Sequence, residues 1–141
     1  MAVPNQIVAS GYPIGIFTFT YLLAGTYADD AAIATTAGKV VTFDSTAAST
    51  MKLSGDGDPI HGRVYVPERR AVLGINVASV ARKFKELVPV AAGYTPVVGD
   101  RVVGGGNGTV KKATANTGAG VPTDPIVVEV GPAGFVAIEY L

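Results

Sequence analysis

Residues 14–23 read Ile-Gly-Ile-Phe-Thr-Phe-Thr-Tyr-Leu-Leu, and this stretch predicts an extended strand. Seven of the nine positions from Ile14 to Leu22 carry β-branched or aromatic side chains, which are enriched in strands. Prolines and glycines precede the stretch and discourage regular structure there. We therefore expect an extended N-terminal arm that leads into a first strand.

The rest of the chain predicts a succession of short strands, because 18 glycines and nine prolines divide the 141 residues into pieces bounded by turn residues. The dipeptide Asn107-Gly108 favours a hairpin, since both residues accept a positive φ. A further turn is expected at Pro67-Glu68-Arg69, and hairpins are expected to join 71–81 to 86–90 and 126–130 to 135–140. The expected strands cover residues 39–44, 50–53, 60–66, 71–81, 86–90, 97–103, 109–113, 126–130 and 135–140.

These features predict an all-β fold, either a small antiparallel β-barrel or a sandwich with an extended N-terminal arm. We expect residues 1–37 to form the arm and first strand, and residues 38–141 to form a compact β domain. One short helix over residues 77–88 is the alternative to a strand there, with Asn76 as its N-cap and Pro89 as its stop. Apolar side chains at helical spacing support this alternative, namely Val77, Val80, Ala81, Phe84 and Leu87.

Composition excludes several classes of function. Eleven basic and eleven acidic side chains cancel, and no Lys/Arg block stands out, so we expect no nucleic-acid partner and no anionic membrane partner. No run of 18 apolar residues suggests a membrane span, and no basic residue precedes Lys39, so a secretory signal peptide is not expected. Only 16% of residues are charged, which is below the roughly 25% usual for soluble domains and suggests a surface covered by a partner.

The candidate catalytic and metal-binding residues are few. His61 is the only histidine, no Gly-x-Ser-x-Gly motif surrounds a serine, and there is no cysteine. A relay of Ser54, His61 and Asp56 or Asp58 is therefore not expected, and one histidine cannot form a typical zinc site. Asp56-Gly57-Asp58 resembles the start of a calcium loop, but loop position 12 is Pro67, so we predict a β-turn and no metal.

Three polar or glycine-rich segments also predict ordinary structure. Asp29-Asp30 indicates a solvated loop, and residues 104–108 indicate a hairpin tip, because the strand-like Thr109-Val110-Lys111 follows where a phosphate loop needs Gly-Lys-Ser/Thr and a helix. The basic clusters Arg69-Arg70 and Arg82-Lys83 with Lys85 indicate a solvated face or an inter-subunit ion pair. We therefore predict that the protein is not an enzyme and carries no cofactor.

The order of strands and turns from Gly38 to Ala113 resembles the small capsid cement (decoration) proteins of tailed phages. The similar features are the strand Lys39–Asp44, the turn Gly55-Asp56-Gly57-Asp58-Pro59, the Gly99-Asp100 pair and the strand Gly108–Ala113. This resemblance covers a little over half of the chain. It implies a compact β domain, commonly trimeric, on the outer capsid surface of a virion assembled in the host cytoplasm. It also implies that the major capsid protein is the partner, and it brings no catalytic residues.

The uncharged first strand is a liability for a free monomer, because an apolar edge strand recruits other chains. We expect it to bind the capsid, and removal of residues 1–24 to leave a folded β domain. The alternatives are a surface-displayed carbohydrate- or receptor-binding β module and another virion role, in head–tail joining or in the tail. The predicted partner-binding residues are Ile14, Ile16, Phe17, Phe19, Tyr21 and Leu22.

Overall fold

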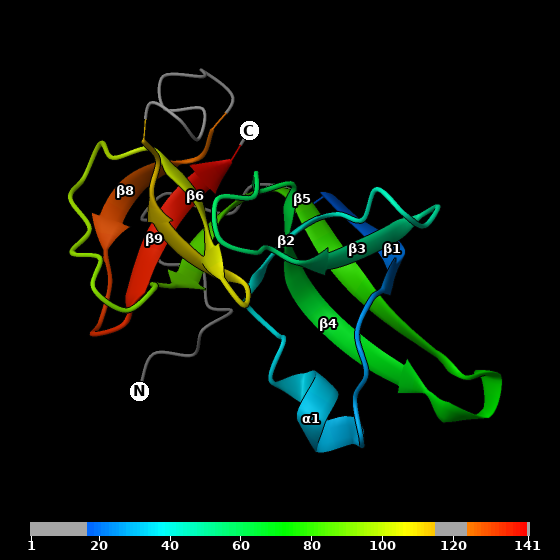
Figure 1. Ribbon diagram of the computed structural model, residues 1–141. Coiled ribbons are helices and arrows are strands. Elements are labelled where there is room, and N and C mark those ends of the chain that lie inside the picture. Colours follow the sequence, from blue (N-terminus) through cyan, green and yellow to red (C-terminus); the bar gives the residue numbers. More distant parts are fainter. Residues whose placement is uncertain (1–16, 115–123, 141) are drawn as a thin grey trace.

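The computed structural model describes residues 17–114 and 124–140, and these form a mostly β protein with one short helix (Figure 1). The all-β prediction is confirmed. No helix among the described residues is long and apolar enough to cross a membrane. The elements are β1 (Phe17–Leu23), α1 (Asp30–Ala34), β2 (Val40–Phe43), β3 (Thr50–Leu53), β4 (Gly62–Arg70), the 3₁₀ turn η1 (Ala71–Leu73), β5 (Ile75–Pro89), β6 (Val102–Gly106), β7 (Thr109–Lys112), β8 (Ile126–Val130) and β9 (Phe135–Tyr140).

Five strands close into a small barrel. The pairing runs from β1 through β3, β2, β4 and β5, and β5 pairs again with β1. The strands of the predicted barrel pair in antiparallel fashion with one exception, because β1 pairs with β3 in parallel. A parallel pair needs a crossover connection, and the segment holding α1 and β2 supplies it. The barrel core contains Leu23, Ile33, Val41, Met51, Val64, Ala78 and Val80.

A second core lies beyond the barrel, around the C-terminal half of β5. Here β5 pairs with β9, and β9 pairs with β8. Single bridges connect Arg101, the residue before β6, to β8, and connect β7 to Val90, the residue after β5. Figure 1 shows β6, β8 and β9 on one side of the molecule and the barrel on the other. This core contains Val40, Ile60, Ala81, Phe84, Val88, Val102, Val110, Val127, Val136 and Ile138.

The segment from residue 71 to residue 90 differs from the prediction. Residues 71–81 and 86–90 are not two hairpin strands, and residues 77–88 are not a helix, because β5 runs unbroken from Ile75 to Pro89. Its two halves contribute to two different cores, so neighbouring residues such as Val80 and Ala81 are both buried. Burial on both faces removes the alternation that identifies a strand, and it also accounts for the apparent helical spacing.

The turns were predicted with mixed success. Asn107 and Gly108 have φ values of 49° and 74° between β6 and β7, which confirms that hairpin turn, and the β8–β9 hairpin is confirmed as well. The turn expected at Pro67-Glu68-Arg69 is wrong, because these residues pair with β5 inside β4. The chain reverses a few residues later, at η1 and Gly74, which has a φ of 67°.

A helical turn replaces the solvated loop expected at Asp29-Asp30. The Asp29 side chain accepts a hydrogen bond of 2.8 Å from the amide of Ala32, so Asp29 is the N-cap of α1. Ile33 in this turn is buried in the barrel core. The helix thus closes over the barrel and leaves Asp29 in a structural role.

A fully buried ion pair connects β4 to β5. Arg63 Nη1 lies 2.7 Å from Glu86 Oε2, with the two side chains 0% and 2% exposed. Arg63 Nε also donates a hydrogen bond of 2.9 Å to the carbonyl of Leu87. Burial lowers the pKa of Arg63 and raises the pKa of Glu86, and in each case the charge of the partner opposes the shift. Nothing in the sequence pattern predicted this pair.

Candidate partner-binding surfaces

The predicted partner-binding strand is a barrel strand with one partly open edge. Ile14 and Ile16 lie outside the described residues, and Phe17 begins β1. Residues 17–22 pair with β5, whereas only Leu22 and Leu23 pair with β3 on the other side. Within the part of the chain that the structure describes, residues 17–21 therefore have no strand partner on their outer edge. Such an edge offers backbone amides and carbonyls to another chain.

An aromatic cluster brings together side chains from β1, β2 and β5. The Tyr21 and Phe43 rings make an edge contact with centroids 5.7 Å apart, and the Phe43 ring lies 5.2 Å from that of His61. The Arg82 guanidinium sits 4.8 Å above the Phe43 ring, within reach of a cation–π contact, and it donates to the Tyr21 hydroxyl at 3.1 Å. We call these four residues the aromatic cap.

Alternation along β1 separates the predicted contact residues into two groups. Phe19 and Tyr21 share a strand face with Leu23, which lies in the barrel core, whereas Leu22 has the opposite orientation. Phe19 is 55% exposed and precedes Tyr21 by two residues on this face of β1. The structure thus places Phe19 and Tyr21 on one surface and Leu22 on another. Phe43 and Arg82, which the sequence reasoning missed, belong to the same surface as Tyr21.

His61 is held in one orientation by its neighbours. Its Nδ1 accepts a hydrogen bond of 3.2 Å from the amide of Phe43 and lies 3.0 Å from Thr42 Oγ1. Because Nδ1 is an acceptor, the neutral ring carries its proton on Nε2. Both contacts of Nδ1 are to neighbouring residues of β2, so they fix the His61 ring against the barrel.

This setting makes stability depend on pH. Burial lowers the pKa of His61, the nearby Arg82 charge lowers it further, and Asp58 opposes the shift. The unfolded chain, with an ordinary pKa near 6.5, then binds a proton that the folded protein rejects. Stability should therefore fall as pH drops below about 6.5. Urea midpoints at pH 7.5 and 5.5 should differ more for the wild type than for His61→Gln, and equal differences would contradict this assignment.

The other polar candidates are part of the scaffold. Asp56 pairs with Lys111 at 2.5 Å. The Asp58 amide donates to the Gly55 carbonyl at 3.2 Å, which is the hydrogen bond of the predicted β-turn, and the Asp58 side chain accepts one of 2.9 Å from the Gly55 amide. No group of three or more potential metal ligands occurs in residues 17–114 and 124–140. The basic residues of the two predicted clusters do not form one patch, because Arg82 belongs to the aromatic cap and Arg69 to the β4–β5 hairpin.

The β4–β5 hairpin projects from the barrel and carries an apolar tip (Figure 1). Val72 is 100% exposed and Leu73 is 66% exposed, both in η1. Largely exposed aliphatic side chains at the end of a hairpin gain little from the fold itself. We call Val72 and Leu73 the hairpin tip.

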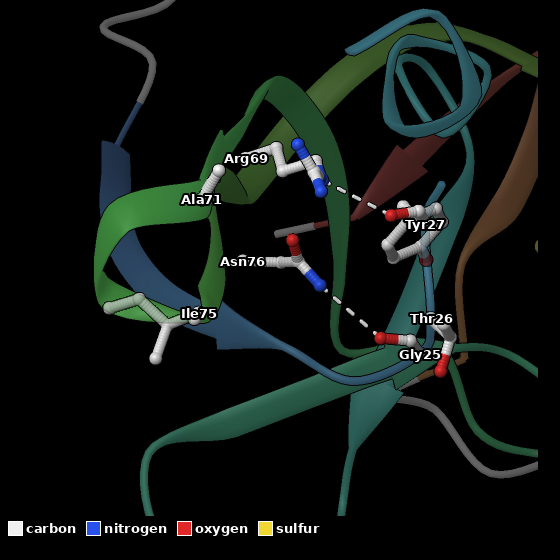
Figure 2. A pocket seen from close by; sticks show the side chains of 8 residues that line it. Gly25, Thr26, Tyr27, Arg69, Ala71, Ile75 and Asn76 are labelled. Carbon is white, nitrogen blue, oxygen red and sulfur yellow. Dashed lines mark hydrogen bonds between the residues drawn. The ribbon is translucent and has the colours of Figure 1, made fainter. Parts of the chain in front are cut away.

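A pocket of about 250 Å³ lies beside the turn of this hairpin, between residues on both sides of the turn and the segment that follows β1 (Figure 2). Arg69 Nε donates to the carbonyl of Tyr27 at 3.2 Å, and Asn76 Nδ2 donates to the carbonyl of Gly25 at 3.2 Å. Both hydrogen bonds tie the hairpin to the segment that follows β1, as the dashed lines in Figure 2 show. The hairpin is therefore braced three residues from Val72 and Leu73 on either strand.

An apolar groove of about 340 Å³ lies near the other end of β5. Its lining contains no charged side chain, and three valines at or beside it, Val97, Val98 and Val130, are each more than half exposed. The loop that forms one wall is anchored by Asp100, which accepts hydrogen bonds from the Tyr94 hydroxyl at 2.9 Å and the Val97 amide at 3.1 Å. The groove is lined by Val90, Ala91, Ala92, Tyr94, Pro96, Val130, Gly131, Pro132, Ala133, Gly134 and Phe135.

Comparison with models of known protein families found no match, and no curated protein matches the chain. The fold and the three surfaces are therefore the observations from which a function is proposed. These surfaces are the open edge of β1 with the aromatic cap, the hairpin tip and the groove.

Proposed function

We propose that the protein is a capsid cement protein that binds across neighbouring major capsid proteins on the outer surface of a virion and stabilises the shell. The observation that carries this proposal is β1, where an open strand edge lies beside exposed Phe19 and the aromatic cap. The surface is on a closed barrel, so it is presented rigidly. The resemblance of residues 38–113 to cement proteins supports the same reading.

Strand addition fits this surface. A neighbouring chain can pair with the outer edge of residues 17–21 through main-chain hydrogen bonds, while the exposed ring of Phe19 enters an apolar pocket of the partner. Burying one such side chain contributes about 1.5–3 kcal/mol. One site of this kind is modest, and several copies joined in an oligomer would act together as a tight clamp.

The proposal predicts that Phe19→Ser weakens shell binding by roughly tenfold or more, because about 1.5–3 kcal/mol of burial is lost and 1.4 kcal/mol is tenfold. The probe is undecorated shells assembled from the major capsid protein of the same genome. Occupancy is measured by co-sedimentation, and protection by the temperature at which the shells open. Val66→Ser is the matched control, since Val66 is 54% exposed and Phe19 55%. Undiminished binding of the Phe19 variant would refute the proposed contact.

The structure also corrects the deletion expected to test the arm. Removing residues 1–24 would delete all of β1, including Leu23 of the barrel core, and would open the barrel. We therefore no longer expect that truncation to leave a folded domain. The informative truncation removes residues 1–16 and leaves every described strand in place. If that variant binds shells as the full chain does, the contact begins at residue 17 or later.

A carbohydrate-binding module is the second candidate, because the aromatic cap offers rings on which a sugar can stack. The two candidates differ in what the purified protein binds. A glycan array with Phe43→Ser as the comparison would show specific, Phe43-dependent binding for a carbohydrate module. For a cement protein, the array stays empty while binding to shells persists.

A further inference from the structure

Exposed apolar side chains gather at the two ends of β5. Among the described residues, nine large hydrophobic side chains are exposed, and five of them lie at these ends. Two form the hairpin tip, directly before β5 begins at Ile75. The other three, Val97, Val98 and Val130, lie at or beside the groove, which starts at Val90 just after β5 ends. β5 thus separates the apolar hairpin tip from the apolar groove.

The hairpin tip and the groove are complementary in chemistry, because both are apolar. The tip presents two aliphatic side chains with no charge between them, and the groove lining also has no charge. An occupant with a charged or strongly polar group would lose its hydration in the groove without a partner in the lining. The groove, at about 340 Å³, lies at the small end of the range for ligand pockets, roughly 300–1,000 Å³, and so suits a few side chains.

The tip cannot occupy the groove of its own chain. β5 has 15 residues, and an extended strand of that length spans up to about 50 Å. Figure 1 shows the β4–β5 hairpin and the β8–β9 turn, which lines the groove, at opposite ends of the molecule. Since Arg69 and Asn76, three residues from the tip on either strand, bind the segment that follows β1, the tip does not fold back toward the groove. Any contact between the two surfaces is between different copies.

We propose that the hairpin tip of one copy inserts into the groove of the next copy, so that the protein assembles head to tail through itself. Each copy then offers one tip and one groove, which makes the interface heterologous, and such an interface closes into a ring when the rotation between copies allows it. A ring places the β1 surfaces of all copies in equivalent positions. The inference deepens the self-association included in the proposed function, but it is tested without shells, so the two can fail separately.

Cysteine cross-linking tests the contact directly, because the chain has no cysteine of its own. In the variant Leu73→Cys with Ala133→Cys, one cysteine lies at the tip and one in the groove. Mild oxidation should produce covalent oligomers at least tenfold more than the control Val66→Cys with Ala133→Cys. Equal yields from the two variants would overturn the proposal.

Mass measurements provide the second test. Light scattering after gel filtration should give an oligomer for the wild type, and Val72→Asp with Leu73→Asp should raise its dissociation constant at least tenfold. Both tip side chains are largely exposed, so this variant should keep the wild-type circular dichroism spectrum. Val66→Asp is the control and should remain oligomeric. A monomeric wild type would overturn the proposal. An oligomeric tip variant would overturn it as well. If that oligomeric variant had also lost shell binding, the tip would contact the capsid and not a second copy.

Discussion

Replacing Glu86 with alanine should lower the free energy of unfolding by about 3–5 kcal/mol, because it removes the carboxylate that pairs with the buried Arg63 guanidinium. The Arg63 side chain is completely buried, and its Nη1 lies 2.7 Å from Glu86 Oε2. The hydrogen bond from Arg63 Nε to the Leu87 carbonyl remains, but a neutral carbonyl cannot balance a full charge. The large cost thus arises from the loss of the opposite charge 2.7 Å from a buried guanidinium.

A double substitution separates the cost of removing one charge from the net contribution of the ion pair to stability. Arg63→Met with Glu86→Leu removes both charges and keeps side chains of similar size, and such replacements are often neutral or stabilising. We expect the double variant to recover most of the stability lost in Glu86→Ala. Glu68→Ala is the control, because Glu68 pairs with Arg70 at 3.3 Å on the surface and should contribute about 0–1 kcal/mol. Urea unfolding midpoints at constant slope measure all three variants.

A result in which Glu86→Ala costs no more than Glu68→Ala would show that water reaches the Arg63 site. A double variant as unstable as the single one would show that packing, and not charge, dominates there. Either outcome would change how β4 and β5 are understood to be held together. The ion pair connects these two strands at the junction of the barrel and the second core.

The local elements of the fold could be predicted where one signal dominates. The Asn107-Gly108 turn was found because positive φ at both positions is a strong local requirement, and the structure has φ values of 49° and 74° there. The strand at Phe17–Leu23 was found because β-branched and aromatic residues fill it. In both cases the information lies within a few residues of sequence, so no tertiary contact is needed to interpret it.

β5 could not be predicted in the same way, because its pattern depends on what lies on both sides of it. A strand that contributes to two cores buries neighbouring residues together, as Val80 and Ala81 show, and then apolar spacing fits strand and helix alike. The buried Glu86 also breaks the apolar pattern, since its partner Arg63 comes 23 positions earlier in the sequence. Only the folded arrangement identifies these two residues as a pair.

The candidate surfaces also contain some residues that local sequence predicts and others that only the folded arrangement brings together. Phe19 and Tyr21 were predicted from the uncharged first strand, but Phe43 and Arg82 join them only because β1, β2 and β5 meet in a barrel. The hairpin tip was missed for a different reason. Val72 is apolar, and an apolar residue in a β-rich stretch is ordinarily assigned to the interior. Its full exposure is a property of the turn position, which the sequence placed at residues 67–69 and the structure places at 71–74.

The two cores should unfold as one unit, and Phe84→Ala is the substitution that tests this. Phe84 is buried in the second core, where its ring lies 6.0 Å from that of Tyr140, and the same strand enters the barrel through Val80 and Ala78. Removing the ring should cost about 3–5 kcal/mol through lost burial and an incompletely filled cavity. Because β5 is shared, the barrel should melt with the second core in a single transition at a lower temperature.

Scanning calorimetry of Phe84→Ala measures that transition, with Phe43→Ala as the matched control. Phe43 lies in the partly exposed aromatic cap, so the same chemical change there should cost only about 1–2 kcal/mol. One lowered transition in the Phe84 variant, with calorimetric and van't Hoff enthalpies in agreement, would support a shared strand that makes the two cores cooperative. Two separated transitions would mean instead that the barrel holds together without the second core, and that β5 can be ordered in one half alone.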